Sequence, residues 1–122
     1  MEWAAAWPDY VPRVVHIIGP GFDIGPYVIE MLDVWTTPIR LDPKWNGGDY
    51  YGRDEPVEGV ANALKIITIT TRAPGWAEKT FGYKPADAAK APAAALGNAF
   101  AIEDTLAKAS AARAKTTDAN AM

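Results

Sequence analysis

The side chains that perform most covalent catalysis are scarce in this chain of 122 residues. It has no cysteine, and His16 and Ser110 are its only histidine and serine. Thiolate nucleophiles are therefore absent, and one histidine is too few for a typical zinc site. A Ser-His-Asp triad would have to use Ser110, which stands in an alanine-rich helical pattern and not in a sharp strand-to-helix turn. His16 lies between apolar residues, so we interpret it as a core histidine. We therefore predict no catalytic residue and no metal site in this chain.

The densest group of polar side chains lies in and beside segment 42–56, DPKWNGGDYYGRDEP: Asp42, Asn46, Asp49, Asp54, Glu55 and Glu58. A calcium-binding EF-hand loop does not fit, because Lys44 and Arg53 stand where two of its oxygen ligands are required. Two interpretations remain. The segment is either a solvated loop anchored by its aromatic residues, or one wall of a ligand pocket formed by Trp45, Tyr50 and Tyr51.

Arg72 follows an apolar helical pattern and precedes Pro74. As a cation at a helix C-terminus it is explained by the helix dipole; binding of an anion in a pocket is the alternative. Four of the five tryptophans are interpreted as core residues because each ring buries a large apolar area: Trp3, Trp7, Trp35 and Trp76.

Composition and charge indicate one soluble domain with a real core, since 49% of residues are hydrophobic and 22% charged. The net charge is −3 without a basic cluster, which makes nucleic acid an unsuitable partner. The longest apolar runs, such as ALKIITIT, are shorter than the roughly 20 residues that span a bilayer. The N-terminal residues lack the basic start of a signal peptide. We therefore expect a cytoplasmic protein with no membrane partner.

The hydrophobic spacing predicts a mostly helical chain with one strand. A run over residues 13–19, RVVHIIG, has the pattern of a strand buried on both faces of a parallel sheet. Apolar residues with a period near 3.6 predict helices over 25–40, with Pro38 breaking or kinking the end, and over 57–71. Further predictions are a helix over 2–7, a loop over 42–56, a turn over 73–76, a polar loop over 81–85, and helices over 86–95 and 99–115, the last capped by Asn98.

Three blocks, EWAAAWPDYV, DPKWNGGDYY and FAIEDTLAKASAARAKTTDAN, resemble in this order the homoserine O-acetyltransferase-like branch of the α/β-hydrolase superfamily. The resemblance spans about Glu2 to Asn120 and implies the α/β class. Residues 1–22 would be a helix and strand of the α/β-hydrolase core, and residues 23–122 a helical lid. In that family the nucleophile elbow precedes the first block, and the acid and histidine follow the last. The resemblance therefore implies an interior fragment that lacks the triad and is inactive alone.

The lid blocks depart from the family at positions that bear on substrate. The family's G-L-x-x-A-R-M pattern places a substrate-binding arginine where this chain has Leu64, and its T-Y-R reads Thr70, Thr71, Arg72. Homoserine specificity is therefore not implied, and an acyltransferase and an ester hydrolase both stay open. The residues offered for the lid pocket are Trp45, Asp49, Tyr50, Tyr51 and Arg72.

No resident cofactor is expected, although the parent enzyme would take acetyl-CoA or another small acyl donor, together with a small-molecule acceptor. The alternative to an enzyme fragment is a non-catalytic helical interaction module. Small side chains on the alanine-rich C-terminal helices permit close approach of another helix pair. Such a module would form a homodimer through these lid helices.

Overall fold

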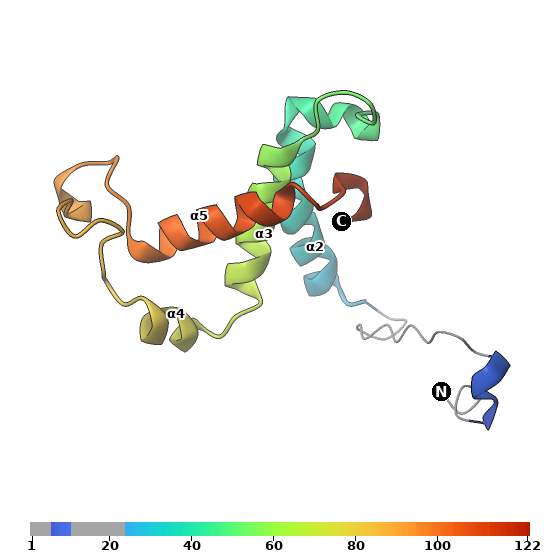
Figure 1. Cartoon of the computed structure of the whole chain (residues 1–122), viewed down its shortest axis with the longest axis horizontal. Helices are drawn as coiled ribbons and strands as arrows, with labels where there is room; N and C mark the ends of the chain where they lie inside the picture. The colour runs from blue at the N-terminus through green and yellow to red at the C-terminus, as the bar shows by residue number, and fades with distance from the viewer. Residues whose placement is uncertain (1–5, 11–23) are drawn as a thin grey trace.

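The computed structural model describes residues 6–10 and 24–122. The strand predicted over 13–19, His16 and most of the helix predicted over 2–7 lie outside the described residues. Within them the secondary structure is helical, with a short 3-10 helix η1 at Pro8–Tyr10 and no strand (Figure 1). One isolated antiparallel bridge joins Pro85 and Phe100. The described part thus has the helical character predicted for residues 23–122.

Helix α2, Pro26–Leu41, confirms the helix predicted over 25–40. Gly25 is extended and Pro26 occupies the first turn, where its missing N–H is no loss. The sequence predicts that Pro38 breaks or kinks the end of this helix. A break is wrong, because Pro38 lies inside the helix, which continues to Leu41, and the kink stays a prediction. Proline there removes one backbone hydrogen bond. The last turn is held instead by packing, since Ile39 is buried in the core and the Pro38 carbonyl lies against α3.

Helix α3, Val57–Thr70, is the central element and packs against both α2 and α5 (Figure 1). Gly59 allows its close approach to α2, since a Cβ atom there would lie 2.8 Å from the Pro38 carbonyl oxygen and 2.9 Å from Asp42 Cβ. The Asp42 side chain accepts a hydrogen bond from the Gly59 N–H at 2.9 Å. That bond satisfies one of the unpaired donors in the first turn of α3 and fixes the loop after α2 to the start of α3.

Segment 72–100 differs from the sequence prediction at two places. Residues predicted as a turn over 73–76 begin a helix instead, α4, Pro74–Thr80, in which Pro74 presets the first turn. The ring of Trp76 packs edge-on against Phe81 at a centroid distance of 5.5 Å. The helix predicted over 86–95 is wrong: these residues form bends and a 3-10 helix, η3, Pro92–Ala94. Pro92 has no N–H to donate, and this alanine-rich stretch has no large apolar face to bury.

Helix α5, Ala101–Ala114, corresponds to the helix predicted over 99–115. Its first turn is closed by Glu103, whose carboxylate accepts from the Phe100 N–H at 2.7 Å. The predicted cap is therefore wrong: Asn98 lies before the helix, and its side chain donates to the Ala91 carbonyl at 2.8 Å. Ser110 lies buried within α5, in the helical setting predicted for it. A last 3-10 helix, η4, spans Ala119–Ala121.

The hydrophobic core gathers residues from four elements and the loop after η2, Pro43–Gly48. Its fully or nearly buried members are Ile39, Tyr50, Val60, Ala63, Leu64, Ala114 and Ala119. The small side chains of Ala63 and Ala114 bring α3 and α5 close together. Across residues 24–122, no helix has the length and apolarity needed to cross a membrane.

Candidate functional site

The residues after α5 turn back over the loop that follows α2. We call residues 116–121 the strap. The hydroxyls of Thr116 and Thr117 both donate to the Arg113 carbonyl, at 3.1 and 2.9 Å, which satisfies a carbonyl in the last turn of the helix. The backbone of Thr116 donates to the same carbonyl at 3.1 Å. These bonds end α5 and direct the strap toward Tyr50 and Tyr51.

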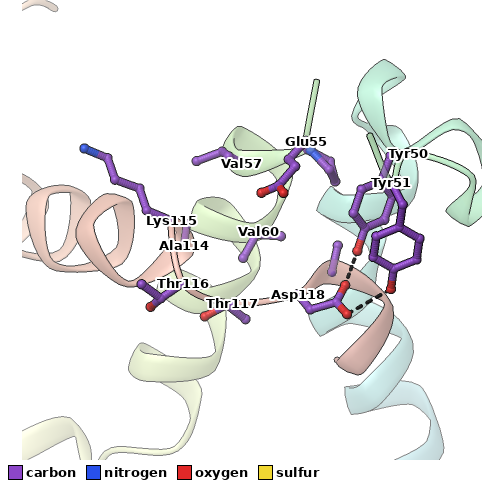
Figure 2. A pocket seen from close by; sticks show the side chains of 12 residues that line it. Tyr50, Tyr51, Glu55, Val57, Val60, Ala114, Lys115, Thr116, Thr117 and Asp118 are labelled. Atoms are coloured by element: carbon purple, nitrogen blue, oxygen red, sulfur yellow. Dashed lines mark hydrogen bonds between the residues drawn. The ribbon is translucent and has the colours of Figure 1, made fainter. Parts of the chain in front are cut away.

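The carboxylate of Asp118 binds both tyrosine hydroxyls (Figure 2). Tyr50 donates to Oδ1 and Tyr51 donates to Oδ2 at 2.9 Å. The two rings lie 4.8 Å apart between centroids, at 36° to each other. Oδ1 also accepts from the backbone N–H of Asn120 at 3.0 Å. One side chain of the strap therefore orients two aromatic side chains of the loop.

Asn120 makes the second attachment between the strap and the loop. Its side-chain oxygen accepts from the indole N–H of Trp45 at 3.2 Å, and its amide donates to the Gly48 carbonyl at 2.9 Å. Its backbone N–H also donates to the Tyr50 hydroxyl at 3.0 Å. Gly48 has φ +95°, a conformation that residues with a Cβ atom rarely adopt. A Cβ atom there would also lie only 3.2 Å from Asn120 Oδ1, so glycine leaves room for the Asn120 side chain.

The surroundings fix the protonation states of Tyr50 and Asp118. Burial raises the pKa of Tyr50 from 10.0 to about 12, and its hydrogen bond to Asp118 adds to that rise. Hydrogen bonds from Tyr50 and then from Tyr51 lower the pKa of the Asp118 carboxyl below its ordinary value. At neutral pH Tyr50 is therefore a neutral donor and Asp118 is an ionised acceptor.

A cavity of about 300 Å³ lies between the two tyrosines, the start of α3 and the end of α5 (Figure 2). Val57 and Val60 of α3 form part of its apolar wall, and Glu55 and Lys115 contribute charged groups. In Figure 2 the Lys115 ammonium lies on the side of the cavity away from Asp118. No serine or cysteine lines this cavity, and its mixed apolar and polar wall is suited to binding a small molecule.

Of the five residues proposed for a lid pocket, the structure places two on the wall of this cavity. Tyr50 and Tyr51 line the cavity, and Trp45 is tied to the strap beside it. Asp49 instead lies at the surface in an ion pair with Arg53 at 3.7 Å. Arg72 lies beyond the other end of α3, where its guanidinium stacks over Trp76 at 4.9 Å. Neither Asp49 nor Arg72 lines the cavity.

Sequence reasoning missed the partners of the tyrosines, Asp118 and Asn120. A local signal was present, because Asp118 accepts from the N–H two residues later, the geometry in which an Asp side chain starts a turn or a short helix. That signal predicts a cap for η4. It does not reveal which distant side chains the remaining carboxylate oxygens bind.

Sequence comparison finds related enzymes that transfer acyl groups. The chain is 35% identical over 112 residues to a homoserine O-acetyltransferase of Thermobifida fusca, a match that covers 87% of this chain and 27% of the relative. It is 41% identical over 66 residues to a homoserine O-acetyltransferase of Natronomonas pharaonis, covering 54% and 16%. A serine O-succinyltransferase of Emericella nidulans is 39% identical over 88 residues, covering 71% and 17%. The chain thus spans about a quarter or less of these relatives, and no protein-family profile matches it.

Among solved structures, the crystal structure of esterase E22 matches with a TM-score of 0.68 and 34% sequence identity. The match covers 97% of this chain and 32% of the esterase. Nearly all of the chain therefore matches about a third of a larger esterase.

Proposed function

The chain belongs to the homoserine O-acetyltransferase-like branch of the α/β-hydrolase superfamily, and from this we propose that it is part of an acyltransferase or esterase whose helical lid is formed by residues 23–122. The match to the esterase carries the proposal, because it includes 97% of this chain at a TM-score of 0.68 but only 32% of the esterase. The helical structure of residues 24–122 supports the same assignment. The chain would be inactive without the remainder of the fold.

In the parent enzyme a serine would be acylated and would pass the acyl group to a hydroxyl acceptor or to water. Backbone N–H donors near that serine would stabilise the negative charge on the tetrahedral intermediate. None of these groups belongs to the lid portion. Its part is to shape the pocket for the acyl acceptor, with Tyr50 and Tyr51 as the leading candidates among its aromatic residues.

Leu64 bears on the choice between transfer and hydrolysis. In the acetyltransferase pattern an arginine at this place would bind a carboxylate, whereas here an apolar side chain is buried between α2, α3 and α5. We therefore propose an acceptor that lacks the homoserine carboxylate, or water as the acceptor. Both are compatible with relatives that include acyltransferases and an esterase.

Two assays test the proposal. The purified chain should not hydrolyse p-nitrophenyl acetate or acetyl-CoA. A chimera in which this chain replaces the matched third of esterase E22 should fold and hydrolyse p-nitrophenyl acetate. A folded chimera without activity would contradict the lid assignment, and so would turnover by the isolated chain that persists in Ser110→Ala.

A helical interaction module is the second candidate, favoured by apolar side chains that α2 leaves in solvent. Tyr27 is 77% exposed, Ile29 57% and Leu32 41%. Sedimentation velocity over a range of concentrations separates the two functions. A discrete dimer of the isolated chain with cooperative melting would favour the module, and a monomer at all concentrations would exclude self-association.

A further inference from the structure

The cavity beside the strap has an unusual hydrogen-bonding character, because every hydroxyl group on its wall already donates its proton elsewhere. Tyr50 and Tyr51 donate to Asp118. Thr116 and Thr117 donate to the Arg113 carbonyl. A hydroxyl has one proton and two lone pairs, so these four groups have only acceptor capacity left for a molecule in the cavity.

The assignment of these protons follows from chemistry. A carbonyl oxygen cannot donate, so the threonine hydroxyls must donate to Arg113. Asp118 is ionised at neutral pH, so both tyrosines must donate to it. The low pKa of Asp118 and the high pKa of Tyr50 keep this arrangement fixed over the physiological range.

The charged groups on the wall add two more acceptors. Asp118 has two oxygens with about four acceptor positions, of which three are filled, by Tyr50, Tyr51 and the Asn120 N–H. The carboxylate of Glu55 has no hydrogen-bond or ion-pair partner among the described residues. Lys115 is the one cationic side chain on the wall, and its ammonium lies away from Asp118 (Figure 2).

We propose that this cavity binds a small molecule carrying a primary ammonium group and a short apolar part. The ammonium would donate to the oxygens of Asp118 and Tyr51, the negative charge of Glu55 on the same wall would attract it, and the apolar part would contact Val57 and Val60. An ammonium supplies three donors and no acceptor, which complements a wall of acceptors. The cavity volume of about 300 Å³ accommodates a molecule of this size. The inference rests on this cavity alone and does not require the parent reaction to be acyl transfer or hydrolysis.

Three isosteric probes test the inference on the 122-residue chain: n-butylammonium, 1-butanol and butyrate. Backbone amide shifts in two-dimensional NMR spectra report binding, and the same spectra report whether each variant is folded. We expect n-butylammonium to shift the amides of residues 55–60 and 114–119 in a saturable manner, and butyrate to leave them unchanged. Equal or tighter binding of butyrate or butanol would overturn the proposal.

Matched variants give opposite expected changes. Glu55→Gln removes a charge outside the strap hydrogen bonds and should weaken n-butylammonium binding by roughly two- to fivefold. Lys115→Gln removes the only cation on the wall and should strengthen binding. Arg53→Gln, which alters an exposed charge that does not line the cavity, serves as the control and should leave binding unchanged. Unchanged binding in both Glu55→Gln and Lys115→Gln would contradict the proposal even if the active chimera confirmed the lid assignment.

Discussion

Tyr50 and Asp118 are 68 residues apart in the sequence and joined by a hydrogen bond in the structure. The tyrosine ring is buried in the core, while its hydroxyl also accepts from the Asn120 N–H at 3.0 Å. The same side chain therefore belongs to the hydrophobic core and to the polar attachment of the strap. Its aromatic ring and its hydroxyl can be tested separately.

We expect Tyr50→Phe to keep the ring in place and remove both hydrogen bonds of the hydroxyl. The free energy of unfolding should fall by about 1 to 2 kcal/mol, because the net contributions of both hydrogen bonds are lost, while the Asn120 N–H keeps Asp118 Oδ1 as an acceptor. Urea denaturation measures the change. Tyr51→Phe is the matched control: its side chain is 63% exposed, so the loss should be smaller. An equal loss in both variants would contradict the role given to burial.

Gly59→Ala should weaken the packing of α2 on α3. The new methyl group would lie 2.8 Å from the Pro38 carbonyl oxygen and 3.0 Å from the Ile39 Cα, closer than real contacts allow. We expect a loss of about 1 to 3 kcal/mol in the free energy of unfolding. Gly75→Ala in α4 is the control, because nothing lies within 4 Å of its added carbon, and it should stabilise the chain by about 0.5 kcal/mol. Thermal melts of both variants measure these changes in stability.

Leu64→Arg tests whether the arginine of the acetyltransferase pattern can be restored by one substitution. Leu64 is 3% exposed, so a guanidinium at this position of the chain would lose its hydration without an acidic partner in the core. We expect destabilisation by about 3 kcal/mol or more. Leu64→Met nearly conserves volume and should cost less than about 1.5 kcal/mol. A stable Leu64→Arg variant would show that the position can face a ligand.

Stability should fall at both ends of the pH range because of the strap. The pKa of Asp118 is lower in the folded chain than its ordinary value of 3.8, so its contribution is present above that pH and is lost as the pH falls through the lowered value. The pKa of Tyr50 is raised from 10.0 to about 12, so its contribution is present below pH 10 and is lost as the pH rises from 10 to 12. Denaturation at a series of pH values measures both losses. Asp118→Asn should abolish the acid loss and Tyr50→Phe the alkaline loss.

Local patterns in the sequence predicted α2 and α3, because each has apolar residues on one helical face, and predicted α5 from its alanine-rich composition. They failed where helix propensity and packing disagree. Residues 86–95 are rich in alanine but have no large side chains to bury and contain Pro92, whereas residues 74–80 form a short helix that starts at a proline and packs Trp76 on Phe81.

Local patterns likewise predicted only the part of the candidate site that lies in one loop. The turn residues of segment 42–56 placed Trp45, Tyr50 and Tyr51 in one loop. In the structure Tyr50 and Tyr51 line the cavity, whereas Trp45 is bound to Asn120 and lines a different pocket. Their role toward a ligand stays a prediction. The pairing of this loop with Asp118 and Asn120 could not be read from one sequence, because neither residue has a local feature that specifies a partner about 70 positions away.

Five hydrogen bonds between residues 45–51 and residues 118–120 close a loop that contains α3, α4 and α5. Closing a loop of 68 residues costs roughly 4 kcal/mol of chain entropy plus a constant, whereas one hydrogen bond contributes about 1 kcal/mol net. No single bond can offset this cost, so the strap depends on all five bonds and on the burial of Tyr50 and Ala119 in the core. The acceptor-lined cavity is thus a product of chain closure and not of any one helix.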